Sequence, residues 1–367
     1  MTGNILLSPY SIASALALTL AGCTPSSPCQ TQIENALGIS SHTEIATARK
    51  KLSTSRLSSE DEGEVNGVEL IMANSIWTSS KVKEDYVTLV EETHDATAKP
   101  LPKNYQTIDN WISEKTKGML KNVLSGDVDP LTVALLVSAI RFKGTWARKF
   151  DVNKTKAGDF HLFEGVHKKR VDYMHAKEKM EVLPYVEELG GASVIRLFYK
   201  NDDFYALFIL PKENTPKSMR DAIEGLVTKG GQLLDNLATF PRRDVNLTLP
   251  RFKISYGTVS LKNTLQQIGI KMPFGDREEK DIFSVMSSDP DVHLDDVLHK
   301  VVLEVNEEGT TAAAATVAKI MTRSMPPPPV HVTFDRPFLM SVMGPGAVPL
   351  FIGRIVDLEA VHDEEDL

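Results

Sequence analysis

Cysteine is scarce in this sequence, with only two residues in a chain of 367. Cys23 and Cys29 lie six positions apart in a loop rich in proline and serine, where they can close a small disulfide or remain two reduced thiols. The low count fits a reducing compartment or an undemanding extracellular one, and it selects neither. No second pair of cysteine or histidine residues lies nearby, and His42 alone makes no site, so we expect no bound metal.

Long apolar runs are also missing, so the sequence predicts no membrane-spanning helix. The apolar segment Ile12 to Leu20 follows Ser8 and Pro9 without a basic flank or a cleavage pattern. We therefore expect a buried helix there and not a signal peptide. The formal net charge of −8 and the isoelectric point near 5.7 argue against binding to nucleic acid or to a membrane.

No proline-rich or low-complexity linker divides the chain, and no internal repeat is present. Helical segments and strand-like runs alternate without a repeated βα unit, so we predict a single α+β domain over residues 1–367. The expected helices are Gln32 to Leu37, Ile108 to Leu124 and Leu261 to Ile268. The expected strands are Val133 to Phe142, Ala192 to Phe198, Phe204 to Leu210, Val245 to Leu249 and Val348 to Ile355.

Catalytic signatures are absent as well. The sequence has no G-x-S-x-G elbow, no H-E-x-x-H pair and no phosphate-binding loop, and its nine histidines are scattered. We therefore expect a protein that is not an enzyme.

The most informative stretch begins near residue 301. Val301 to Val305 is rich in β-branched residues and predicts a buried strand. Two glutamates follow, then Gly309, which supplies a pivot without a Cβ, then a run of threonine and alanine from Thr310 to Thr316. Alanine favours a helix, whereas the alternation described below favours a strand, and both can hold in different states of one molecule.

This stretch resembles the hinge of the serpin reactive-centre loop, which is bait for a protease and inserts into the central sheet as a new strand once it is cut. The hinge residues are Glu307, Glu308, Gly309, Thr310, Thr311, Ala312, Ala313, Ala314, Ala315 and Thr316. In such a strand alternate side chains face the core. The inward set is small or apolar throughout: Thr310, Ala312, Ala314, Thr316, Ala318 and Ile320. Lys319 falls on the outward set. The alternative interpretation is a flexible alanine-rich connector, which would not need this alternation of inward and outward residues.

Other segments extend the resemblance over nearly the whole chain in the same order. They are Asn4 to Leu20, Asn110 to Leu124, Leu136 to Trp146, Leu249 to Ile254, Leu265 to Ile270, Phe334 to Leu339 and Pro349 to Val356. The resemblance implies the serpin fold: a large, mainly antiparallel central sheet with further sheets, surrounding helices and an exposed reactive-centre loop, here about 307–329. An acidic tail is expected at about 358–367.

The resemblance also implies a reactive bond. The family places the residue before the cut about sixteen positions beyond the first hinge glutamate, and from Glu307 this count reaches Arg323, with Ser324 after the cut. Arginine is the side chain that a trypsin-like pocket recognises. We therefore expect a monomeric suicide-substrate inhibitor of trypsin-like serine proteases that needs no cofactor. The alternative is a non-inhibitory serpin that acts as a carrier, chaperone or storage protein.

Two departures from the family pattern stand out. The sequence starts about where the family's first helix has ended, so we expect that helix to be missing. The polar cluster that holds the central sheet closed, here called the shutter cluster, has serine where the family usually has asparagine. Its residues are Ser8, Ser11, Ser138 and His299. Serine offers fewer hydrogen-bonding groups than asparagine, so we expect either a weaker cluster at Ser138 or a water in place of the missing contact.

A short basic run lies in the region that resembles the heparin-binding helix of some serpins. Its residues are Arg49, Lys50, Lys51 and Arg56. A glycosaminoglycan site and an ordinary solvated helix face are both compatible with this run. The compartment is equally open: cytoplasmic if Met1 is the true start, and extracellular if an amino-terminal segment is missing.

Overall fold

The computed structural model describes residues 3–54, 67–118, 120–121, 124, 126–165, 167–235, 240–255, 258–275, 280–308 and 328–359. The α-helices within these ranges are α1 (Pro9–Gly22), α2 (Pro28–Leu37), α3 (His42–Thr54), α4 (Glu84–His94), α5 (Gln106–Lys115), α6 (Pro216–Asp235) and α7 (Lys262–Gln267). None of the described helices is long and apolar enough to cross a membrane.

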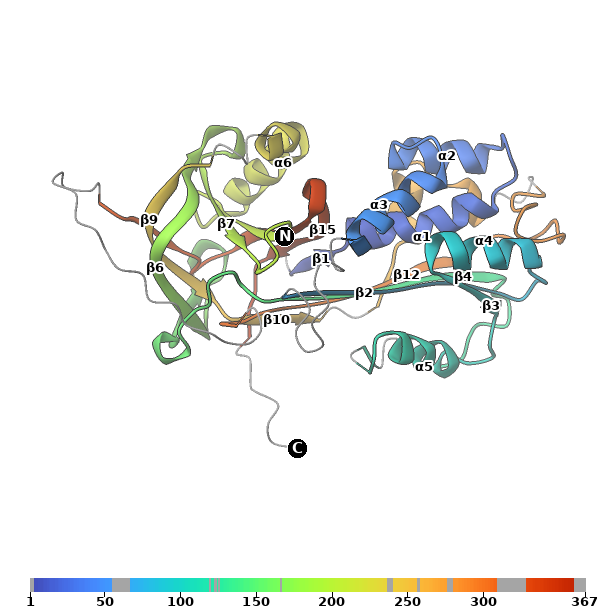
Figure 1. The fold of residues 1–367 in the computed structure, drawn as a ribbon, viewed down its shortest axis with the longest axis horizontal. Coiled ribbons are helices and arrows are strands. Elements are labelled where there is room, and N and C mark those ends of the chain that lie inside the picture. The colour runs from blue at the N-terminus through green and yellow to red at the C-terminus, as the bar shows by residue number, and fades with distance from the viewer. Residues whose placement is uncertain are drawn as a thin grey trace.

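The first sheet has the strand order β10–β12–β4–β2–β3, with β11 paired to β12. These strands are β2 (Val68–Thr78), β3 (Thr97–Pro100), β4 (Ala134–Gly144), β10 (Phe252–Ser255), β11 (Val259–Ser260) and β12 (Asp296–Val305). Helices α1 to α4 lie over one face and α5 lies over the other (Figure 1). The central strand β4 is therefore covered on both sides, which explains why its first seven residues are all buried and mostly apolar.

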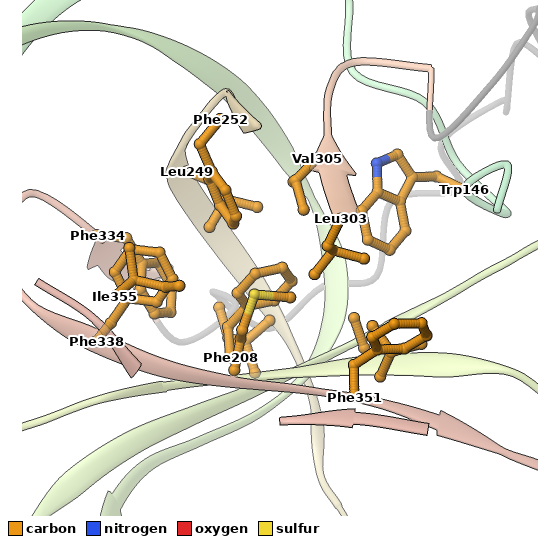
Figure 2. Close-up of a cluster of buried hydrophobic side chains, with 14 of the residues drawn as sticks. Trp146, Phe208, Leu249, Phe252, Leu303, Val305, Phe334, Phe338, Phe351 and Ile355 are labelled. Atoms are coloured by element: carbon orange, nitrogen blue, oxygen red, sulfur yellow. The ribbon is translucent and has the colours of Figure 1, made fainter. Parts of the chain in front are cut away.

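The second sheet has the order β1–β15–β14–β8–β7–β6–β9–β13, with β5 paired to β6. Its strands are β1 (Ile5–Leu7), β5 (Lys156–His161), β6 (Lys168–Val186), β7 (Ala192–Phe198), β8 (Tyr205–Leu210), β9 (Arg242–Pro250), β13 (Val330–Thr333), β14 (Phe338–Gly344) and β15 (Val348–Ile355). Side chains from both sheets share one buried cluster, in which Leu303 and Val305 of β12 meet Phe208, Phe338 and Phe351 (Figure 2).

Helix α1 starts at a serine cap followed by proline. Ser8 is the N-cap and its hydroxyl accepts a hydrogen bond from the Ser11 amide, while Pro9 occupies the first turn. The helix is buried over most of its surface, as expected for Ile12 to Leu20. Cys23 and Cys29 form a disulfide that joins the end of α1 to the first turn of α2, which settles the question that the spacing left open.

The expected strands are all present, and the segments Ala192–Phe198 and Val348–Ile355 match their predicted bounds. The helix predicted from Ile108 to Leu124 was too long, because α5 ends at Lys115. The two residues after Thr116 explain the stop. Lys117 and Gly118 have positive φ angles of 54° and 74°, which no right-handed helix contains.

Candidate functional site at the opening of the first sheet

The centre of the first sheet holds a parallel strand pair. β4 and β12 are paired from Leu135 opposite Asp296 to Arg141 opposite Val302. Beyond this point the two strands no longer pair with each other. β4 pairs with β2 as far as Gly144, and β12 pairs with β10 as far as Val305. The ladder between the two strands thus stops three residues before β12 ends.

The chain leaves β12 at this open end and enters the hinge. The three residues that follow β12, Asn306 to Glu308, are held by the segment that follows β4. The indole nitrogen of Trp146 donates to the carbonyl of Asn306 at 2.9 Å, and the Trp146 amide donates to the carbonyl of Glu308 at 3.3 Å. The amide of Phe150 donates to the carbonyl of Glu307 at 3.0 Å. We call this set of residues the hinge anchor. Its members are Asn306, Glu307, Glu308, Trp146 and Phe150, together with Thr155 and Arg251, which contact the Glu307 side chain as described below.

Glu307 is a buried carboxylate, with its side chain only 6% exposed. Thr155 donates its hydroxyl proton to Oε1 of Glu307 at 2.6 Å. Nε of Arg251, which precedes β10, lies 3.9 Å from the other carboxylate oxygen. A buried carboxylate needs such partners, because removing it from water is costly when it is left alone. No pattern in the sequence predicts that Thr155 or Arg251 meets the hinge.

Trp146 is fixed in place by its packing. Its ring stacks on Tyr199 with centroids 4.5 Å apart and planes 11° from parallel. Gly144 permits this approach, because a Cβ there would lie 2.5 Å from the Tyr199 ring. Burial raises the pKa of the Tyr199 hydroxyl, so the ring stays neutral. The same indole lies beside Leu303 and Val305 of β12 (Figure 2).

The four residues of the shutter cluster come together under the closed part of the β4–β12 pair, and each is at most 1% exposed. The Ser8 amide donates to Nε2 of His299 on β12 at 3.2 Å. The hydroxyls of Ser11 and Ser138 share a short hydrogen bond, and the Ser138 hydroxyl also lies 3.2 Å from the Ser11 carbonyl. The start of α1 therefore binds β4 and β12 at once.

His299 must be neutral to accept the Ser8 amide proton. Burial lowers its pKa to about 4, and a backbone hydrogen bond with Ser138 offsets this only in part. His299 and Ser138 lie directly opposite each other in the ladder, and Asn74 of β2 lies opposite Ser138 on the other side. Asn74 was not among the predicted site residues. Its signal is a polar residue inside the apolar strand from Val68 to Thr78.

Several predicted site residues lie outside the described part of the chain. They are the hinge from Gly309 to Thr316, the bond between Arg323 and Ser324, and Arg56. In the basic run, Arg49 forms an ion pair with Asp95 and its side chain is 24% exposed, whereas Lys50 is exposed. The described residues contain no cluster of three side chains that could hold a metal ion.

Comparison with known proteins places this architecture in a family. The family profile for serpins, described as serpin (serine protease inhibitor), matches residues 1–358, and the chain belongs to this family. It is 30% identical to Serpin-ZX of Arabidopsis thaliana over 96% of this chain and 92% of that one. It is also 30% identical to the leukocyte elastase inhibitor of Bos taurus, over 96% and 93%.

Among solved structures, human thyroxine-binding globulin complexed with thyroxine is similar in fold. The TM-score is 0.80 at 26% sequence identity, and the match covers 97% of this chain and 92% of that one. Serpin relatives thus include a protein named as a protease inhibitor and one named for binding a small molecule. The family and the fold expected from the hinge and the other segments are confirmed.

Proposed function

We propose that this protein inhibits trypsin-like serine proteases by trapping them as a covalent acyl-enzyme, with Arg323–Ser324 as the reactive bond. The observation that carries the proposal is the parallel β4–β12 pair, whose ladder stops three residues before the end of β12 that leads into the hinge. A chain that turns back at Gly309 runs antiparallel to β12. Because β4 and β12 are parallel, it runs antiparallel to β4 as well.

Insertion between these two strands exchanges one parallel ladder for two antiparallel ladders. Parallel pairing is slightly less stable per residue, and an inserted strand also satisfies the backbone groups of the whole loop. The inward side chains are small or apolar from Thr310 to Ile320, as burial in the sheet requires. Insertion is therefore downhill once cleavage removes the tether at the far end of the loop.

The chemistry belongs to the protease. Its serine oxygen attacks the carbonyl carbon of Arg323, and its histidine takes the serine proton. The bond to the Ser324 nitrogen breaks, and that nitrogen leaves as an amine with the proton that the histidine returns. Arg323 is now esterified to the protease, so insertion of the freed loop carries the protease along. Inhibition results if insertion distorts the protease before water hydrolyses the ester.

A charged residue at an inward hinge position should separate cleavage from trapping. For Thr310→Arg we expect cleavage at Arg323 but loss of the covalent complex, because the guanidinium would have to be buried for insertion to proceed. The matched control is Thr311→Arg, which places the same charge on the outward side and should still give complex. Undiminished complex from Thr310→Arg on a denaturing gel would contradict the insertion account.

The test of the proposed function is incubation with trypsin near equal molar ratio, followed by a denaturing gel and intact mass. A covalent adduct, with the residues after Arg323 released, supports both the mechanism and the bond. Cleavage at Arg323 without an adduct means that insertion is too slow. An intact Arg323–Ser324 bond would remove the inhibitor proposal for this class of protease.

The second candidate is a non-inhibitory serpin. The fold similarity to thyroxine-binding globulin favours it, since that relative is named for a small-molecule ligand. A covalent adduct with trypsin would exclude the second candidate, because a carrier is cleaved or ignored without forming an adduct.

The Cys23–Cys29 disulfide supports an oxidising, extracellular compartment as a further part of the proposal. A thiol titration of the protein purified from its natural source tests this, with no reactive thiol expected. The glycosaminoglycan site would rest on the basic run Arg49, Lys50, Lys51 and Arg56. Salt-sensitive retention on heparin that disappears when these four are neutralised would support it.

A further inference from the structure

A cavity of about 90 Å³ lies next to the hinge anchor. One wall is the segment Trp146 to Phe150, and the others are β6, β7 and β9. Trp146 and Phe150 are the residues whose amides hold the carbonyls of Glu308 and Glu307. A molecule in this cavity would therefore touch the same segment that fixes the start of the hinge.

The cavity carries an excess of positive charge. Four cationic side chains line it, and two of them are neutralised: Arg148 by Glu178 at 2.7 Å, and Arg196 by Glu181. The other two are Lys179 and Arg242, both exposed. No ion pair of Lys179 or Arg242 occurs within the described part of the chain. Two positive charges thus remain available to a ligand.

The remaining lining is largely apolar. It includes Met180, Leu197 and Phe198 beside the rings of Trp146 and Phe150. Buried apolar walls with a few convergent polar groups are typical of small-molecule sites. The walls suit an apolar body, and the two available cations suit an anionic group on that body.

We propose that this cavity binds a small organic anion, namely a carboxylate carried on an aromatic or branched aliphatic body. Lys179 and Arg242 bind the carboxylate, and Met180, Leu197 and Phe198 contact the apolar part. A bound ligand ties the segment Trp146 to Phe150 to β6 and β7, and so steadies the hinge anchor. Its consequence for protease trapping rests on the proposed function, whereas the site itself does not.

Benzoate and benzamide are the probes, since they share a ring and differ in charge. Trp146 is the reporter in a Trp77→Phe, Trp111→Phe background, because the other tryptophans pack elsewhere. We expect benzoate to change the Trp146 fluorescence saturably, with a dissociation constant of about 1 mM or below. Benzamide should bind at least about tenfold more weakly, which corresponds to the loss of a charge-assisted contact.

Two variants test the assignment of the charged group. Lys179→Gln combined with Arg242→Gln should weaken benzoate binding at least about tenfold and leave benzamide unchanged. Lys177→Gln is the matched control, because Lys177 is exposed on the same strand and outside the cavity. Equal affinity for the two probes, equal binding by the double variant, or no saturable change would each overturn the site.

Hydrogen exchange tests the effect on the hinge without reference to any protease. The Glu308 amide donates to Asn306 Oδ1 at 3.2 Å, so its exchange reports the state of the hinge anchor. Saturating benzoate should slow this exchange severalfold in the parent protein and not in the double variant. Unchanged exchange with benzoate bound would refute the coupling and leave the site standing. A failed trypsin adduct would instead count against the proposed function alone.

Discussion

The two ends of the β4–β12 pair are held in opposite ways. At the shutter cluster the strands are laddered to each other, and the start of α1 binds both of them. At the hinge anchor the β4–β12 ladder has stopped. There β4 pairs with β2, and β12 pairs with β10. There the contacts join the hinge to the segment after β4 through backbone carbonyls and one buried carboxylate.

This difference indicates where the sheet opens first. Parting the strands at the hinge anchor breaks no recorded β4–β12 ladder bond, whereas parting them at the shutter cluster breaks ladder bonds and buried side-chain hydrogen bonds together. An incoming strand should therefore enter at the hinge anchor and meet its main resistance at the shutter cluster. The hinge anchor would control the start of insertion, and the shutter cluster would control its completion.

The largest expected effect is at Glu307. Glu307→Lys removes the acceptor of the Thr155 hydroxyl and places a second cation near Arg251, so we expect a loss of roughly 3–5 kcal/mol in the free energy of unfolding. Urea denaturation measures this loss. Glu304→Lys, three positions earlier and exposed, should cost less than about 0.5 kcal/mol. Similar losses in the two variants would show that the carboxylate at 307 has no special role.

The next effect is a pH dependence that belongs to the shutter cluster. The pKa of His299 is about 4 when folded and about 6.5 as a free side chain, so the unfolded chain takes up the proton more readily. The stability that neutral His299 provides is complete above pH 6.5 and is lost as the pH falls toward 4. The loss is about 3 kcal/mol. Unfolding free energies between pH 7 and pH 4 measure it.

His299→Gln should flatten this dependence, because glutamine keeps an acceptor for the Ser8 amide and does not titrate. His94→Gln is the comparison variant. Nε2 of His94 lies 3.0 Å from Nδ1 of His42 between α3 and α4, and burial lowers its pKa to about 4, so it also contributes acid sensitivity. Only His299→Gln should alter the rate of adduct formation with trypsin. Equal effects of both variants on that rate would rule out a specific shutter role.

The smallest effect is expected from Ser138→Ala, at about 1–2 kcal/mol, since one buried hydroxyl that joins β4 to α1 is lost. Ser14→Ala is matched in chemistry. That buried hydroxyl donates to the Tyr10 carbonyl within α1 at 2.8 Å and joins no strands. Both variants should lose stability, but only Ser138→Ala should speed insertion into the sheet. Faster insertion in both variants would show that general destabilisation is responsible.

The sequence predicted the elements well where a local pattern determines them. The strand-like runs Ala192 to Phe198 and Val348 to Ile355 depend on neighbouring residues, and both are found in the structure with the predicted bounds. The end of α5 was missed because a left-handed turn at Lys117 leaves only a weak trace in composition. The roles of Thr155 and Arg251 could not be predicted, because each meets Glu307 from a distant part of the chain.

Strand β6 belongs to three ladders of the second sheet. Its 19 residues span roughly 60 Å when extended, and they pair with β5, β9 and β7. Because β6 belongs to three ladders, we expect a bend at one point of the strand to strain hydrogen bonds along much of its length. We therefore expect the second sheet to keep its shape while β4 and β12 separate.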